Sequence, residues 1–328
     1  FKFKKMLLKL CVAIFLVLNS AKGFITQPAK ISHRLSSSTS SPAIFDEIVK
    51  NENSKKKFVG ITANQFQHPF DQEATAALKK LPGLEASVRT IIPLIEEGIY
   101  LDNIANSVLV GPTQLPSIYG LLEEACTILD IGVPELYVRQ NPIPNAYTLA
   151  VRGNKPFIVL HTSLIDLMTE GELQAVIAHE LGHLKCEHGV WITAANVLTA
   201  GVSNVGFGLG RFVAEFLGMC RLLQFWRLTA ELSCDRAALL VSQDVEVVAS
   251  VLLKLVGGGM KNSNQLNVAD FLKQAQMYEN ASKTRVGRLV SRAISAGLTH
   301  PLPVLRAKEL DSWAKSAQYL NIVKKGEF

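Results

Sequence analysis

The chain has 328 residues, enough for one or two domains, and its mean hydropathy of +0.21 is high for a soluble protein. Its net charge is +6, but five lysines within the first 23 residues account for most of it, and the other basic runs are short and lack interleaved aromatic residues. This distribution excludes a typical nucleic-acid-binding surface, and five scattered cysteines without a C-x-x-C pair exclude a disulfide framework.

The first 57 residues have the composition of a targeting leader. Within residues 1–23, lysines flank the apolar run 10–18 and small residues follow it, which is typical of a secretory signal peptide. The run is short for crossing a bilayer, although an uncleaved anchor is an alternative. Residues 24–57 begin with a Ser- and Thr-rich stretch that holds two basic residues and no acid, as transit peptides do, and continue as a linker. Together the two parts predict a plastid (chloroplast) protein, with secretion or an endomembrane location as the alternative.

Residues 58–328 form one predicted domain of the α+β class, mostly helical. Helical apolar spacing covers residues 71–107, with breaks at prolines, and returns from 118 to about 129. Three short β-type runs follow, at residues 136–139, 147–151 and 157–161. Gly153-Asn154 between the last two is a hairpin signal. The runs predict a small antiparallel or mixed sheet whose edge can pair with an extended peptide, although a plain core hairpin fits the same pattern.

Residues 179–183 read His-Glu-Leu-Gly-His, and the residues before them have the apolar spacing of a helix that enters a core. On a helix, residues four apart point to nearly the same side and lie ~6 Å apart along the axis. His179 and His183 can therefore hold one metal ion, and Glu180 can reach a water molecule on it. This is the H-E-x-x-H pattern of zinc proteases, in which the glutamate is the general base. A surface helix that carries two histidines by chance is the alternative.

Residues 190–226 form a hydrophobic arm with three interpretations. The stretch 190–210 has no charged residue, but four glycines interrupt it, and residues 211–227 carry one acid and three arginines. The arm can span a bilayer as a pair of helices, pack over the site, or lie on a bilayer surface. A membrane surface is therefore a candidate partner.

A catalytic zinc ion takes three protein ligands and leaves one position open for water. Glu231 and Asp235 lie four residues apart in an apolar helix that runs through Leu240, so they share one face. A carboxylate is a good third ligand beside two histidines, which makes Glu231 the candidate. An acid one turn further can accept the ring N–H of a ligating histidine, and this is the role expected of Asp235 unless Arg236 neutralises it. An ordinary exposed acidic face is the alternative.

Other side chains near the motif are poorer candidates. A third histidine six residues after His183 would complete a known pattern, but position 189 is glycine. His188 is one residue early, about 100° away on a continuing helix, so we interpret it as a solvated or capping residue. Cys186 and Cys234 lie near the site at angles unlike those of ligands, and we expect both thiols to be buried or unreactive.

The wider sequence resembles the gluzincin zinc endopeptidases, the family of the CaaX prenyl protease and the heat-shock protease HtpX. The matching stretches are 178–185, 230–238 and Thr299-His300-Pro301, within a similarity that runs from about residue 64 to about 315. The resemblance is closest to the compact bacterial and plastid branch, the minigluzincins. The family usually has alanine where this chain has Cys234, a change between small residues.

The resemblance implies roles for individual residues. The zinc ligands would be His179, His183 and Glu231, with one zinc ion per subunit and Glu180 as the base. His300 matches a family histidine near the cleft that can stabilise the oxyanion, although a structural role before Pro301 is an equal alternative. A segment used in the family to lay substrate along a strand edge matches here at Asn145, Ala146 and Tyr147.

These features predict a metalloendopeptidase that hydrolyses polypeptide substrates, with plastid protein quality control as its expected role. Zinc lowers the pKa of its bound water, and Glu180 removes the proton as the water attacks the scissile carbonyl. Two other classes remain open. A non-catalytic zinc scaffold would show a fourth protein ligand, and a membrane-associated binding protein with an accidental motif would lack zinc.

Overall fold

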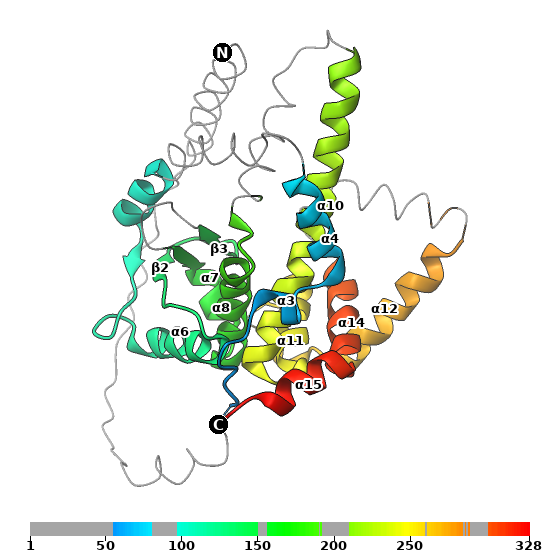
Figure 1. Ribbon diagram of the computed structural model, residues 1–328. Coiled ribbons are helices and arrows are strands. Elements are labelled where there is room, and N and C mark those ends of the chain that lie inside the picture. The colour runs from blue at the N-terminus through cyan, green and yellow to red at the C-terminus, as the bar shows by residue number, and fades with distance from the viewer. Residues whose placement is uncertain are drawn as a thin grey trace, which may run out of the picture.

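The computed structural model describes residues 55–80, 97–149, 156–189, 191, 210–259, 261–284, 286, 288 and 301–328. The predicted leader up to residue 54, the hairpin turn, and residues 190 and 192–209 of the predicted arm lie outside this part of the chain. The labelled elements are α3 (Ala63–Phe66), α4 (Pro69–Lys79), β1 (Val108–Leu109), α6 (Pro116–Leu129), β2 (Glu135–Arg139), β3 (Ala146–Leu149), β4 (Phe157–His161), α7 (Thr162–Leu167), α8 (Glu170–Lys185), α10 (Gly210–Ser242), α11 (Val245–Gly257), η1 (Ser263–Gln265), α12 (Val268–Ser282), α14 (Pro303–Ala314) and α15 (Ala317–Lys325). Helices dominate around one small sheet, which confirms the predicted α+β class (Figure 1).

The sheet is mixed, with its four described strands in the order β1-β2-β4-β3. β2 and β4 run parallel, whereas β3 lies antiparallel to β4 with Thr148 opposite Ile158. β4 lies between β2 and β3 and is buried along its whole length. β3 stands at the edge of the described sheet and packs against α8. The predicted strand edge therefore lies beside the helix that carries the H-E-x-x-H motif.

Helix α8 begins with a capping box and runs into the core. The Thr169 hydroxyl accepts from the Glu172 backbone N–H, and the Glu172 carboxylate accepts from the Thr169 N–H at 2.7 Å, so two backbone donors that the helix cannot satisfy are paired. The same carboxylate accepts from the Lys254 ammonium and the Ser250 hydroxyl, each at 2.6 Å. This buried ion pair ties α8 to α11 and fixes where the motif helix enters the fold.

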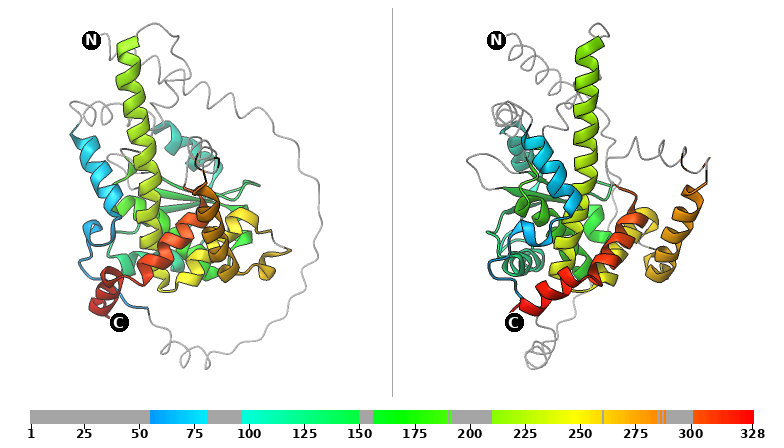
Figure 2. Two further views of the ribbon diagram at one scale, coloured as in Figure 1. Left: turned by 90° about the vertical axis from the view of Figure 1, so that its right-hand side faces the viewer. Right: turned by 45° about the vertical axis from the view of Figure 1, so that its right-hand side comes forward.

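Helix α10 packs along α8 and extends beyond the other described elements (Figures 1 and 2). Gly182 allows the two helices to approach closely. A β-carbon at that position would lie 2.9 Å from Cβ of Ala237 and 3.0 Å from Cα of Cys234, closer than side chains tolerate. The glycine within the motif therefore brings the α10 backbone against α8. Among the described residues, we find no helix that combines the length and apolar character needed to cross a bilayer.

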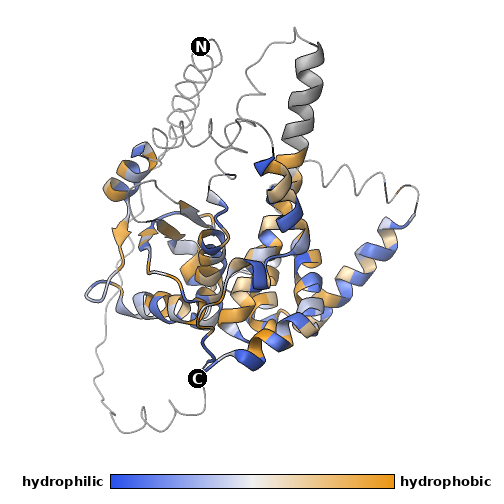
Figure 3. Cartoon of the chain, in the orientation of Figure 1, coloured by the Kyte–Doolittle hydropathy of each residue, from blue (hydrophilic) through white to orange (hydrophobic). Residues whose placement is uncertain are grey.

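The core lies where these helices meet the sheet. Hydrophobic residues gather on the strands and on the packed faces of α8, α10 and α11, while the projecting α12 carries many hydrophilic ones (Figure 3). The first described residues close the lower end of the molecule, because Lys57 and Glu327 exchange backbone hydrogen bonds and the adjacent Phe58 is buried. The end of the predicted linker, residues 55–57, thus lies against the C-terminal residues.

Candidate metal centre

Helix α8 presents two imidazoles to one carboxylate on α10. The rings of His179 and His183, one turn apart, have centroids 5.3 Å apart. The Nε2 atom of His179 lies 3.4 Å from one oxygen of Glu231, and Nε2 of His183 lies 3.7 Å from the other. Glu231 and His183 are buried, and His179 is partly exposed. Two helices that are separated in sequence therefore direct two nitrogens and a carboxylate to one point.

This donor set suits zinc. Two imidazole nitrogens and one carboxylate form a known three-ligand arrangement that leaves a fourth position for water. Here each oxygen of the Glu231 carboxylate faces the Nε2 atom of one histidine. A bound ion would take the place of these direct contacts and be held by all three groups. The residues present therefore fit a catalytic zinc ion.

Cys234 offers a different third ligand. Ligand atoms of His179, His183 and Cys234 lie within 4.8 Å of one another, so the thiol is closer to the histidines than its helical angle predicted. Burial raises the pKa of the Cys234 thiol well above its ordinary value in the metal-free protein. Its sulfur also lies 3.7 Å from Nδ1 of His188. Glu231 is the better candidate for the third donor because its two oxygens face the Nε2 atoms of both histidines and a carboxylate beside two histidines is a known catalytic zinc set.

Asp235 lies behind His179, on the side away from Glu231. Its Oδ1 atom is 3.1 Å from Nδ1 of the ring, so the carboxylate can accept the N–H of an imidazole whose Nε2 binds metal. Burial alone lowers the pKa of His179, but its hydrogen bonds with Asp235 and Glu231 outweigh burial and raise the pKa to about 9. A metal ion that binds at this ring must therefore displace a proton.

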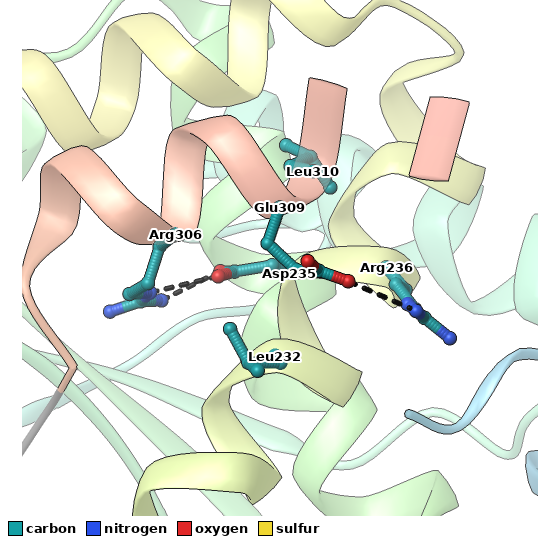
Figure 4. A pocket seen from close by; sticks show the side chains of 6 residues that line it. All are labelled: Leu232, Asp235, Arg236, Arg306, Glu309 and Leu310. Atoms are coloured by element: carbon teal, nitrogen blue, oxygen red, sulfur yellow. Dashed lines mark hydrogen bonds and ion pairs between the residues drawn. The ribbon is translucent and has the colours of Figure 1, made fainter. Parts of the chain in front are cut away.

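The partner of Asp235 is Arg306, not Arg236. Arg306, on α14, donates from Nε at 2.8 Å and from Nη2 at 2.6 Å to the two oxygens of Asp235. Burial by itself raises the pKa of Asp235. The charge and hydrogen bonds of Arg306 lower the pKa by more than burial raises it, so the carboxylate stays ionised. Arg236 instead contacts Glu309 at 3.4 Å, as Figure 4 shows. Sequence neighbourhood suggested Arg236, but consecutive residues on a helix point about 100° apart, and packing decides which one meets the acid.

Glu180 lies beside the metal site and has a partner that the sequence did not reveal. The hydroxyl of Thr148, on β3, donates to the Glu180 carboxylate at 2.6 Å. Glu180 is buried, so this contact orients its carboxylate. Thr148 follows directly after the segment Asn145, Ala146 and Tyr147, which the structure places at the start of the edge strand, with Ala146 opposite Leu160. In the sequence, only the β-type run at residues 147–151 could have indicated Thr148, because it predicted a strand that includes this residue.

His188 is not solvated. Its side chain is buried, with Nδ1 3.1 Å from Nδ1 of His183 and Nε2 3.0 Å from Oδ2 of Asp71. The interpretation as a solvated residue was wrong because it assumed a continuing helix, whereas the capping role is confirmed at the backbone, since the His188 N–H donates to the His183 carbonyl at 2.9 Å. Helix α8 ends at Lys185, and Glu187 adopts a left-handed backbone angle, φ = 56°, that turns His188 back beneath the motif. Asp71, on α4, was not singled out by any sequence pattern. His300 lies outside the described residues.

Comparison with known proteins shows which family the chain resembles. The family model "Peptidase family M48" matches residues 121–314. The chain is 51% identical over 269 residues to the plastoglobule-localized metallopeptidase 48, chloroplastic, of Arabidopsis thaliana, covering 82% of this chain and 77% of that protein. It is 26% identical over 174 residues to protease HtpX homolog 2 of Methanosarcina mazei, covering 45% of this chain and 58% of that protein. The crystal structure of S. mikatae Ste24p matches 74% of this chain and 62% of that chain, with 18% identity and a TM-score of 0.37.

The family match includes the whole of α8, α10 and α14 and therefore every described residue that faces the metal site from these helices. The relative from Arabidopsis thaliana extends the similarity over most of the chain. The predicted resemblance to HtpX-type proteases is confirmed. The chain belongs to peptidase family M48 and is a zinc-dependent metallopeptidase.

Proposed function

We propose that His179, His183 and Glu231 bind the zinc ion of this peptidase and that Glu180 is its general base. One observation carries the assignment: the Glu231 carboxylate lies 3.4 and 3.7 Å from the Nε2 atoms of the two histidines. Glu180 follows the first ligand on the same helix and turns its carboxylate toward β3, where Thr148 contacts it. The geometry supports endopeptidase chemistry at the junction of α8, α10 and β3.

When bound, zinc acts as a Lewis acid that makes water a better nucleophile and stabilises negative charge on the scissile carbonyl oxygen. Glu180 takes the proton of the attacking water and passes it to the leaving amine. Asp235 accepts the Nδ1–H of His179, and Arg306 keeps Asp235 ionised, so the ring presents Nε2 in a fixed orientation. His300 remains a proposed stabiliser of the oxyanion.

The substrate is a polypeptide, and we place it along the outer edge of β3. Extended peptides add to a sheet edge through backbone hydrogen bonds, which accept many side-chain sequences. Asn145, Ala146 and Tyr147 begin this edge, and β4 occupies its other side. A peptide paired with β3 would pass beside Glu180, because Thr148 of the same strand contacts that carboxylate.

Replacing Thr148 with valine is expected to lower kcat by about 10–100-fold, because a hydrogen bond to a charged group contributes about 1.5–3 kcal/mol and this one orients the base. KM should change little, since the backbone edge of β3 is retained. Steady-state cleavage of a fluorogenic peptide gives both constants. The same substitution at Thr127, an exposed residue of α6, is the control and should have no effect. Unchanged kcat in Thr148→Val would show that the hydroxyl does not support catalysis.

We propose a plastid location and a role in protein quality control. The relative from Arabidopsis thaliana is named for chloroplasts and plastoglobules. The signal-like residues 1–23 and the transit-like residues 24–57 support the same compartment. The arm of residues 190–226 supports contact with a membrane surface, because its first part lacks charge.

Metal analysis combined with proteolysis tests the proposed function. We expect the purified full chain to carry one zinc ion and to cleave casein, a zinc chelator to stop cleavage, and added zinc to restore it. Chelator that is already saturated with zinc is the control and should not inhibit. Zinc without cleavage would favour a scaffold, and cleavage that survives removal of all metal would refute the mechanism.

A further inference from the structure

We propose that Asp71 and His188 are positioning residues for the zinc ligand His183. Asp71 fixes the orientation and tautomer of His188, and His188 accepts the N–H that His183 directs away from the metal. The inference rests on the proposed ligand set. It assigns a role to two residues that are not ligands themselves.

The three side chains form a continuous chain of hydrogen bonds. Nδ1 of His183 lies 3.1 Å from Nδ1 of His188, and Nε2 of His188 lies 3.0 Å from Oδ2 of Asp71. The side chains of His188 and Asp71 are 1% and 0% exposed, so water does not compete for these contacts. His183 and His188 come from the motif helix and the turn directly after it, whereas Asp71 comes from α4, which is remote in sequence.

Only one assignment of protons satisfies this series of hydrogen bonds when a metal is bound. His183 turns Nε2 toward Glu231, so its Nδ1 carries the proton and donates. Nδ1 of His188 must then accept, which requires that His188 carries its proton on Nε2. The Asp71 carboxylate holds this tautomer because it accepts the Nε2 proton. Both proposed histidine ligands then have a partner for Nδ1, Asp235 for His179 and His188 for His183.

Asp71 is held firmly enough to fix His188. Its Oδ2 also accepts from the Ser233 hydroxyl at 2.6 Å and the Gln67 amide at 2.8 Å, and its Oδ1 accepts from Thr75 at 3.1 Å. These donors favour the ionised carboxylate, and although burial raises the pKa of Asp71, the contacts with His188 and the other donors lower it overall. The acid is therefore a permanent acceptor for His188.

Trp226 fixes the plane of the His188 ring. The indole packs edge-on against the imidazole with centroids 5.5 Å apart, and its Nε1 donates to Thr75 at 2.8 Å. Asp71 and Thr75 lie outside the segment 121–314 that matches the family model. Helix α4 is thus an N-terminal element of this chain that supports the metal site from behind.

The test measures zinc affinity rather than activity. Full-length protein is stripped of metal, and its zinc dissociation constant is determined by competition with a chelator at one pH. We expect His188→Leu to weaken zinc binding by about 10–100-fold, the usual effect of removing the partner of a ligating histidine. Asp71→Asn should weaken it in the same direction. His188→Asn should lose less than His188→Leu, since its amide oxygen can take the place of Nδ1 as the acceptor.

A double variant separates positioning from general stability. If Asp71 acts on zinc only through His188, then Asp71→Asn should change zinc affinity by less than about twofold in the His188→Leu background. Glu172→Gln is the matched control, because it disrupts another buried ion pair on α8. It should lower the thermal midpoint without changing zinc affinity or the visible spectrum of cobalt-substituted protein. His188→Leu should change that spectrum.

Two results would overturn the inference. The first is a folded Asp71→Asn protein that binds zinc within twofold of the parent, a result that does not depend on whether His188→Leu folds. The second is equal loss of affinity in Glu172→Gln, which would make the effect one of general stability. Failure of the ligand set itself is distinguishable, because Glu231→Ala would then bind zinc like the parent.

Discussion

Replacing Glu180 with glutamine is expected to reduce peptide hydrolysis by about 10²–10⁴-fold while zinc remains bound. The amide has nearly the shape of the carboxylate and can still contact Thr148, but it cannot take a proton from water. The proposed ligands His179 and His183 are unchanged, so the metal content should stay at the parent value. Substrate should still bind along β3, and KM should therefore change little.

The measurement combines zinc content with cleavage of an unfolded reporter protein by the same preparation. Glu172→Gln provides the control, since it makes the same chemical change on the same helix but at the buried ion pair with Lys254. It should retain turnover at temperatures where it is folded. A native cleavage rate in Glu180→Gln would falsify the assignment of the base.

Replacing Glu231 with alanine is expected to remove zinc and, with it, activity. The carboxylate is the only proposed ligand from α10, and two histidines alone make an incomplete site. The loss of affinity should exceed the roughly 10–100-fold typical of outer partners such as His188. Glu231 also forms an ion pair with Arg306. Without Glu231, less negative charge balances the Arg306 cation, and this further disfavours binding of the zinc cation.

Cys234→Ala is the matched comparison, because Cys234 lies one turn from Glu231 and also near the histidines. We expect this variant to keep zinc and activity, since Glu231 and not the thiol is the proposed third ligand. Equilibrium dialysis followed by metal analysis reports both affinities. The opposite pattern, zinc lost in Cys234→Ala and retained in Glu231→Ala, would assign the thiol as the ligand.

The sequence alone determined the features that depend on local spacing. Four-residue spacing puts His179 and His183 on one side of a helix, and the same rule puts Glu231 and Asp235 together, because the helical repeat is fixed by the backbone. Apolar periodicity and turn residues likewise predicted α6, β2 and β4 within two residues. These features need no knowledge of what packs against them.

Only the tertiary structure decided which remote side chains surround that site. Asp235 meets Arg306 rather than its neighbour Arg236, and Thr148 reaches Glu180 because β3 lies against α8. His188 faces inward because a left-handed residue ends the helical repeat after α8, and its partner Asp71 is 117 residues away. Such contacts depend on helix ends and on the packing of separate elements, which no periodicity within a single segment encodes.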